Sequence, residues 1–300
     1  MSDDREGPPP AQESLTAEDA FGLIGNETRA AILRVLGQDA YSVLSFSGLR
    51  SRVDADIDSG QFNYHLQRLV GHFVEQTEDG YQIRPQGRTL HRTIRAGTFT
   101  DRISFDQLDA GFACYFCETR VEAAYDDGLL TIQCPDCEHV YSITDLPPSA
   151  IDTDDKDALF SRIGQYSRHN LLAFARGVCP ICANALDTDF HPAEEMAVPS
   201  AKQHHHSVFV DRSCNYCDNR MYMSVGEALL GDPGLISFCR DRGIDVTKTP
   251  TWELEFAATD RYVTVRSMDP WEVALKLTFD GDTLKLVVDD QLNVTERIGP

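Results

Sequence analysis

Eight of the nine cysteines stand in four Cys-x-x-Cys pairs, and this spacing constrains the chain more than any other feature. Two thiolates on one tight turn supply half of a tetrahedral Zn²⁺ site, and a second such turn completes it. The sequence therefore predicts two structural Zn²⁺ ions. The predicted ligands form two quartets: Cys114, Cys117, Cys134 and Cys137, then Cys179, Cys182, Cys214 and Cys217.

The first quartet encloses a pattern of short strands. The stretch "VEAAYDDGLLTIQ" predicts a hairpin that turns at Asp127-Gly128, and "HVYSI" predicts a third strand. This arrangement resembles a zinc ribbon. A module of this size buries little apolar surface, so bound zinc would contribute much of its folding energy. A redox-active or metal-sensing quartet is the alternative.

The second quartet has a longer gap, because 31 residues separate Cys182 from Cys214. We interpret it as a second zinc ribbon with an inserted loop that carries His191 and the run His204–His206. A histidine run in a polar loop favours solvation; the alternative is that one of these histidines serves as a metal ligand. Cys239 stands alone in an apolar, helix-like stretch, which predicts a small buried hydrophobic residue.

The composition is strongly acidic. The 300 residues carry 48 acids against 27 bases, a formal charge of −21, and only five of the bases are lysines. Acid excess with scarce lysine is typical of proteins that stay soluble in molar salt, as in salt-accumulating archaea; an acidic mesophilic protein is the alternative. Residues 1–14 predict a disordered acidic, Pro-rich tail without a signal-peptide core. We expect a cytoplasmic chain without membrane spans, whose reduced thiols bind metal.

The charge is unevenly distributed. Residues 1–40 carry −5 and residues 101–300 carry −17, but residues 41–100 hold seven arginines and six acids, a net +1. This part begins its helices with capping residues. Thr16 and Asn26 predict two helix starts, Ser45 or Ser47 a third, and Asp58 a fourth.

The helix predicted over 59–72 has one apolar face and one polar face. Its apolar stripe comprises Phe62, Leu66, Leu69, Val70 and Phe73. Asparagine and glutamine side chains pair with adenine, arginine pairs with guanine, and tyrosine reaches phosphates or thymine methyl groups. The candidate DNA-binding residues are Ser59, Gln61, Asn63, Tyr64, Gln67, Arg68, Arg84 and Arg88.

After this helix, Asp79-Gly80 predicts a β-hairpin and Pro85 opens another helix. Helix, helix, recognition helix, hairpin, helix is the order of a winged helix-turn-helix. The stretches "LIGNETRAAILRVLG", "SFSGLRSRV" and "SGQFNYHLQRLVGHFV" resemble the winged-helix domain of ArsR-type transcriptional regulators, in the form common in haloarchaea. The resemblance implies a homodimer on a short inverted repeat. Residues 1–113 hold no cysteine, so the family's thiolate metal-sensing site is absent.

The rest of the chain predicts helices and antiparallel strands. Residues 149–177 form a connecting helical segment with Leu159, Ile163, Tyr166 and Phe174 on its apolar stripe, and with a solvated arginine face. Two short helices break at 232–234, and four or five antiparallel strands follow. Trp252 and Trp271 are expected in the core, with a pocket as the alternative. The expected fold class is α+β multidomain, with a winged helix at 15–100, zinc ribbons at 110–148 and 178–226, and an α/β domain at 227–300.

No P-loop, GxGxxG, GxSxG, HExxH or zinc-deaminase motif is present, and four-cysteine sites leave no open metal position, so we expect no enzyme. We expect a dimeric, sequence-specific transcriptional regulator of the cytoplasm and nucleoid. Its partners would be double-stranded DNA and a protein of the transcription machinery. Molar salt screens distant acids, so base contacts would supply the specificity. The alternative is a zinc-ribbon adaptor that binds protein or RNA, with the winged helix used for protein contacts.

Overall fold

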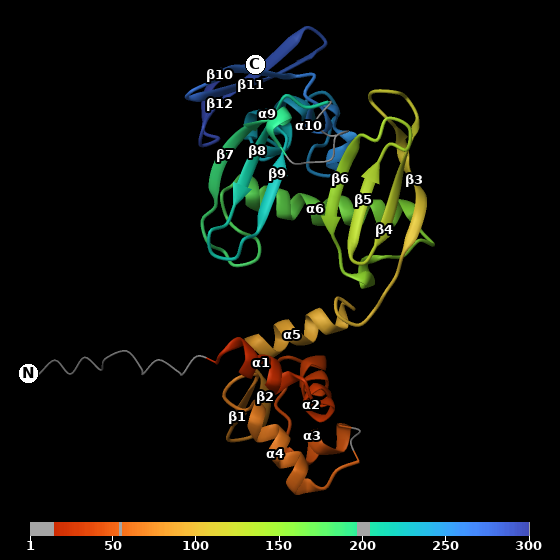
Figure 1. Ribbon diagram of the computed structural model, residues 1–300, viewed down its shortest axis with the longest axis vertical. Coiled ribbons are helices and arrows are strands. Elements are labelled where there is room, and N and C mark those ends of the chain that lie inside the picture. Colours follow the sequence, from red (N-terminus) through yellow and green to blue (C-terminus); the bar gives the residue numbers. More distant parts are fainter. Residues whose placement is uncertain (1–14, 54–55, 197–204, 300) are drawn as a thin grey trace, which may run out of the picture. The chain divides into compact units, whose positions relative to one another are not determined.

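The computed structural model describes residues 15–53, 56–196 and 205–299 (Figure 1). The chain divides into two compact units, residues 1–100 and residues 101–300. The predicted tail, residues 1–14, lies outside the described residues, as does His204.

The first unit consists of helices and one hairpin. The elements are α1 (Ala17–Ile24), α2 (Glu27–Gln38), α3 (Phe46–Arg52), α4 (Ser59–Leu69), β1 (Val74–Thr77), β2 (Gly80–Ile83) and α5 (Pro85–Arg95). The predicted caps are confirmed: the side chains of Thr16, Asn26, Ser45 and Asp58 accept backbone N–H bonds at the starts of α1 to α4. Capping is local in sequence, which is why the pattern reveals it.

Helix α4 buries Phe62, Leu66 and Leu69 as predicted, but it ends at Leu69 rather than at residue 72. Val70 adopts an extended conformation, and Gly71 has a φ of +86° that stops the helix. The remaining stripe residue, Phe73, is half-buried beyond the helix end. The earlier end leaves the polar face unchanged, because all six polar candidates on this helix lie between Ser59 and Arg68.

The hairpin turns one residue earlier than predicted. Thr77 pairs with Gly80, so Glu78 and Asp79 form the loop and Gly80 begins β2. A Cβ at position 80 would lie closer than 3.0 Å to the Leu44 carbonyl, because Leu44 exchanges two backbone hydrogen bonds of 2.9 Å with Tyr81. Leu44 thus pairs with β2 as a single bridging residue, and position 80 has no room for a side chain beside it.

The second unit begins with a four-stranded antiparallel sheet in the order β3 (Phe105–Ala113), β4 (Arg120–Asp126), β5 (Leu129–Gln133), β6 (Val140–Asp145). The predicted hairpin at 127–128 is confirmed, because Asp126 pairs with Leu129 and both loop residues have positive φ. Strand β3 was not predicted and extends the sheet before residue 110. Its pairing with β4 is interrupted twice, so its sequence lacks a regular alternation.

Two further sheets follow. One has the order β7 (Asp187–Pro192), β8 (Val208–Ser213), β9 (Arg220–Met223), and the other is β10 (Val263–Met268), β11 (Trp271–Phe279), β12 (Asp282–Asp289), β13 (Val294–Ile298). The predicted helices flanking 232–234 are α8 (Val225–Ala228) and α9 (Pro233–Arg240), and α10 (Glu255–Ala258) precedes β10. Single turns of 3₁₀ helix lie at Pro148–Ala150, Ala193–Glu195 and Thr251–Glu253. An antiparallel C-terminal sheet of four or five strands was predicted, and the observed sheet has four.

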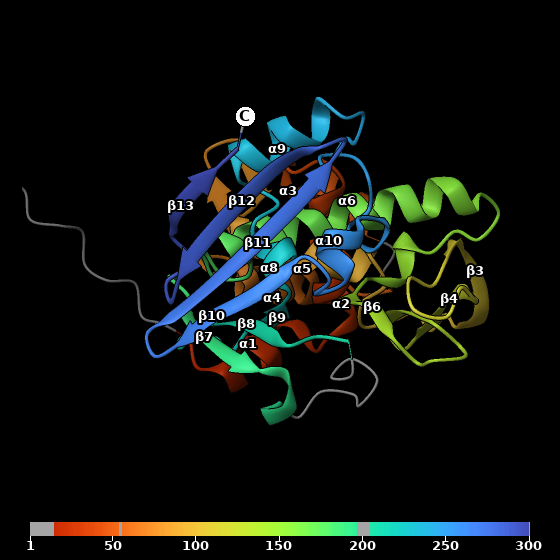
Figure 2. The ribbon, with the colours of Figure 1, turned by 90° about the horizontal axis from the view of Figure 1, so that it is seen from above.

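Helix α6 (Lys156–Ala175) runs across the second unit (Figures 1 and 2), and its side chains join two hydrophobic cores. Leu159 and Ile163, in its N-terminal half, pack in the core of the first sheet together with Trp252. Leu171 and Phe174, in its C-terminal half, pack in the core shared by the other two sheets. The stretches 110–148, 178–226 and 227–300 therefore lie in one compact unit.

Two side chains of α6 differ from the prediction. Tyr166, expected on the apolar stripe, is 45% exposed. Arg168, expected on a solvated face, is 5% exposed and donates to the Thr249 carbonyl at 2.6 Å. Burial lowers the pKa of Arg168 from its ordinary value. The helix is therefore enclosed on more sides than its periodicity indicates.

Candidate metal centres and the polar face of α4

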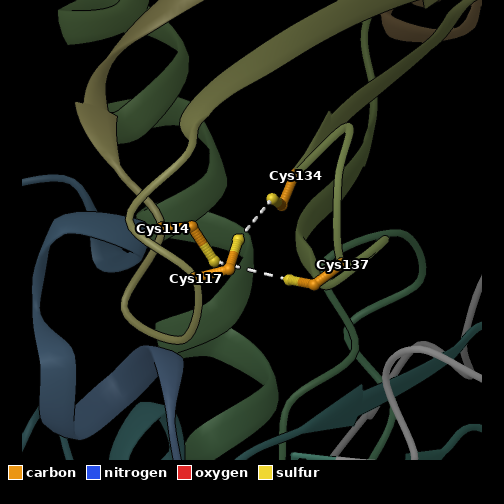
Figure 3. A group of neighbouring side chains, drawn as sticks. All are labelled: Cys114, Cys117, Cys134 and Cys137. Carbon is orange, nitrogen blue, oxygen red and sulfur yellow. Dashed lines mark hydrogen bonds between the residues drawn. The ribbon is translucent and has the colours of Figure 1, made fainter.

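The first cysteine quartet converges on one point (Figure 3). The Sγ atoms of Cys114 and Cys137 lie 3.6 Å apart, and those of Cys117 and Cys134 lie 3.4 Å apart. Tetrahedral zinc with Zn–S bonds of about 2.3 Å holds its sulfurs about 3.8 Å apart. The sulfurs therefore fit a metal ion such as zinc.

The second quartet has the same geometry. The Sγ atoms of Cys179 and Cys217 lie 3.6 Å apart, and those of Cys182 and Cys214 lie 3.5 Å apart. In both quartets the four sulfurs lie within 4.8 Å of one another. Among the described residues no histidine joins either group, so both predicted all-cysteine ligand sets are brought together as expected.

A repeated backbone turn positions all eight sulfurs. The residue after the second cysteine of each pair has positive φ: Glu118 (63°), Glu138 (59°), Ala183 (61°) and Asp218 (58°). The first cysteine of each pair donates its N–H across the turn to the residue five places later, as Cys114 does to Thr119 at 2.8 Å. A Cys-x-x-Cys pair followed by such a turn is here called a knuckle. The left-handed residue carries no glycine signal, so the sequence analysis missed it.

N–H and O–H donors surround the sulfurs. The Tyr141 hydroxyl donates to Cys114 Sγ at 3.2 Å, and the Asn184 amide donates to Cys182 Sγ at 3.3 Å. Burial raises the pKa of Cys179, but the N–H groups of Cys182 and Ile181 outweigh it and lower the value to about 6. Thiolates bind metals, so the donors to Cys179 and Cys182, whose pKa values are both lowered, favour the ligand form of these two cysteines. Cys239 is fully buried with a pKa raised to about 11 by burial, as expected of a hydrophobic residue.

The described part of the histidine run is not solvated, contrary to the prediction. His205 stacks on Phe116 with ring centroids 3.7 Å apart. His206 has a 4% exposed side chain, and its Nδ1 lies 3.0 Å from the Asp260 carboxylate. His139, fully buried, packs its ring against both. These ring contacts pack the first quartet's knuckles against His205 and His206, which lie just before β8.

Candidate DNA-contacting residues gather on one face of α4. Tyr64 is 59% exposed, and the others on this helix are also exposed: Ser59, Gln61, Asn63, Gln67 and Arg68. Gln67 also donates to the Tyr81 hydroxyl at 3.4 Å, which links α4 to the hairpin. The opposite face is buried in the core of the unit.

The two remaining candidates make contacts inside the unit. The Arg84 guanidinium donates to the Gly71 carbonyl and so ties β2 to the end of α4. The Arg88 guanidinium lies 5.8 Å from the ring centroid of Tyr41, which is 84% exposed. Arg84 therefore makes an internal contact that its sequence position did not reveal, and its contact with DNA stays a prediction.

The fold and sites thus define a two-unit chain with two tetracysteine centres. The model of a domain of unknown function, DUF7351, matches residues 111–294, which hold both quartets, and the chain belongs to that family. A second domain of unknown function, DUF7347, matches residues 17–94. No curated protein matches the chain. In the part of the chain that the structure describes, no helix is long and apolar enough to cross a membrane.

Proposed function

We propose that residues 15–100 are a winged helix-turn-helix domain that binds double-stranded DNA at specific sequences. In this proposal the recognition helix is α4 and the wing is the β1–β2 hairpin. The observation that carries it is the division of α4: six polar side chains are exposed, and Phe62, Leu66 and Leu69 are buried on the other side. A solvated helix needs no such concentration of amide, guanidinium and phenol groups.

The chemistry of this face suits base edges. Asn63, Gln61 and Gln67 offer paired donors and acceptors for adenine, and Arg68 offers a donor fork for guanine. Tyr64 would contact a phosphate or a thymine methyl group. The wing tip, Glu78 and Asp79, is acidic, so we assign the wing a positioning role through the Arg84 contact instead of a phosphate contact.

The charge distribution is consistent with this role. Residues 41–100 carry +1 within a chain of −21. In molar salt the Debye length is about 3 Å, so acids outside the reading face barely repel DNA. Counterion release then adds little affinity, and direct base contacts carry the specificity. This is the setting that the resemblance to haloarchaeal ArsR-type regulators implies.

We further propose that the chain is a homodimer. Phe21 on α1 is 71% exposed, Phe99 after α5 is 73% exposed, and Ile94 on α5 is 38% exposed. Apolar side chains at such exposure are candidates for burial against a second copy. A two-fold dimer presents two copies of α4 and so reads an inverted repeat.

The metal ions in this proposal are structural zinc. Four thiolates complete the coordination of zinc and leave no open position for catalysis. Zinc would hold the two knuckles of each quartet together. It would thereby stabilise the strands that are attached to those knuckles. The protein would act in the cytoplasm at the nucleoid, with a component of the transcription machinery as a further partner.

The test is genome-wide crosslinking and sequencing of bound DNA in the native host. The parent is compared with an Asn63→Ala/Tyr64→Ala double variant and with Gln38→Ala, which changes an exposed residue of α2. We expect discrete peaks that share a short inverted repeat in the parent and in Gln38→Ala, and their loss in the double variant. Equal profiles for the parent and the double variant would refute the assignment of α4 and favour the adaptor function.

A further inference from the structure

The two zinc-ribbon modules differ in what covers their knuckles. In the second module Tyr216 is 78% exposed, Ile181 is 76% exposed, and Val178 is 45% exposed. We call these three residues the ribbon 2 tip. Ile181 and Tyr216 occupy the same position in their knuckles, directly before the second cysteine, and the two knuckles share one sulfur cluster. Both side chains therefore project from the same end of the module.

The first module shows how such a knuckle is covered. In Cys114-Tyr115-Phe116-Cys117, Phe116 occupies the position of Tyr216, and it is half-buried. The Arg261 guanidinium lies 5.3 Å from the Phe116 ring centroid and donates to the Tyr115 carbonyl. Its other nitrogen donates to Glu255 at 2.5 Å. His205 also stacks on the Phe116 ring, with centroids 3.7 Å apart. The first knuckle is thus covered by an imidazole and by an arginine that a ring, a knuckle carbonyl and a carboxylate hold.

The second module repeats these groups. Cys214-Asn215-Tyr216-Cys217 has an aromatic ring at the same position and the Asn215 carbonyl before it. The Asp187 carboxylate stands beside this knuckle, because the Asn215 side-chain amide donates to it. Among the described residues, however, no guanidinium lies over the Tyr216 ring. The two arginines nearest in sequence have other partners: Arg220 pairs with Asp211 at 3.3 Å, and Arg212 donates to Thr188 and to the Ala175 carbonyl.

We propose that the ribbon 2 tip docks an arginine-containing basic segment of a partner protein. The guanidinium stacks on Tyr216 and pairs with Asp187, and apolar side chains of the segment cover Ile181 and Val178. Arginine suits this site because its planar group stacks on a ring and donates to a carboxylate and a carbonyl together.

Local charge favours a cationic protein over a nucleic acid. Asp187, Asp189 and Asp218 are exposed on this module. Because these carboxylates lie on the module itself, they can attract a basic segment at contact distance, where salt screens little. A phosphate backbone would meet the same carboxylates and be repelled.

The experiment uses the zinc-loaded full chain and three labelled probes in low-salt buffer. The first is a peptide of four Gly-Arg-Gly repeats, the second replaces each arginine with lysine, and the third is a twelve-nucleotide single-stranded RNA. Fluorescence anisotropy gives Kd, and isoleucine methyl NMR locates the site through the Ile181 signal. We expect the arginine peptide to bind at least about tenfold more tightly than the lysine peptide, since an ammonium does not stack as a plane.

Variants separate stacking from general charge. Tyr216→Ser should weaken binding of the arginine peptide about tenfold, whereas Tyr216→Phe should keep it, because the ring supplies the contact. The matched control is Tyr166→Ser, which removes a 45% exposed tyrosine from α6 of the same unit and should bind like the parent. Metal content per chain verifies that each variant is folded. Equal affinity for the two peptides, unchanged binding by Tyr216→Ser, or preference for the RNA would each overturn the proposal.

Discussion

At the residue scale, Gly37 marks a close approach between α2 and α5. A Cβ at this position would lie closer than 3.0 Å to the imidazole ring of His91. Gly37→Ala should therefore destabilise the first unit by about 1–3 kcal/mol, because the ring or the helix must shift. Chemical unfolding followed by circular dichroism measures the change.

Two further variants test whether this ring is the cause. In a His91→Ala background the Gly37→Ala cost should vanish, so the double-mutant cycle should show a coupling of similar size. Gly22→Ala, in the same unit, has no neighbour within 4 Å and should be stabilising by about 0.5–1 kcal/mol. An equal loss for Gly37→Ala with and without His91 would contradict this account.

The carboxylate of Asp260 is a second residue-scale case. It accepts hydrogen bonds from His206 Nδ1 at 3.0 Å, Ser207 N at 2.6 Å, and Ser207 Oγ at 2.8 Å. Burial raises the pKa of Asp260, but His206 and Ser207 outweigh it, and the pKa lies below its ordinary value. The stabilisation is therefore present above pH 3.8 and is lost as the pH falls through the lower folded value.

Asp260→Asn should destabilise the second unit at pH 7 by about 1–3 kcal/mol, because the amide cannot accept all of these bonds. The exposed Asp290→Asn serves as control and should have little effect. The difference in free energy of unfolding between Asp260→Asn and the parent should narrow progressively as the pH falls below about 4. A gap that persists unchanged at pH 3 would show that the charge of Asp260 is not what stabilises the fold.

Residues whose partners are near in sequence could be predicted, and residues with distant partners could not. Thr16 and Asp58 cap helices through atoms two or three positions away, so the pattern was sufficient. His206 meets Asp260, 54 positions later, and Arg168 meets Thr249, 81 positions later. Nothing local distinguishes these buried polar groups from solvated ones.

At the element scale, hairpin loops determine strand pairing. Asp280 and Gly281 connect β11 to β12, with φ of 51° and 89°. Gly281→Ala has open space around its Cβ, so its expected loss of about 1–2 kcal/mol comes from backbone strain alone. Gly281→Asn should lose less, because asparagine tolerates left-handed φ. Thermal unfolding of both variants tests this, and equal losses would contradict it.

Elements with a strong turn or cap were predicted well, and irregular ones were not. The hairpin at Asp127-Gly128 was predicted because two residues favouring positive φ stand between two alternating runs. Strand β3 was missed because Gln107 and Gly111 interrupt its ladder with positive φ. The cysteine quartets were predictable in full, since ligand type and spacing define them independently of the strands around them.

At the scale of the whole molecule, α6 determines the architecture of the second unit. Its periodicity predicted an apolar stripe but not the two cores on which the stripe divides. That division depends on Trp252 and Leu254, residues about 80–95 positions further along the chain. Long-range packing of this kind leaves no periodic signal, so the ribbons looked like separate modules in the sequence.

This architecture makes a prediction about metal removal. All cysteines and both tryptophans, Trp252 and Trp271, lie in residues 101–300, which form a unit of their own. Tryptophan emission therefore reports on the second unit alone. A strong chelator should shift this emission to longer wavelength as the sheets lose their anchored ends, because thiolate coordination contributes folding energy.

The first unit should remain folded during that step, since it contains no cysteine and has its own core. Helical circular dichroism should consequently fall only in part and then show a separate, chelator-independent thermal transition. Cys239→Ser provides the control, because this buried thiol belongs to neither quartet, and its metal content should equal that of the parent. If tryptophan emission stayed unchanged after complete removal of the metal, the ions would have no structural role. If both units unfolded together, the division of the chain into independent units would be wrong.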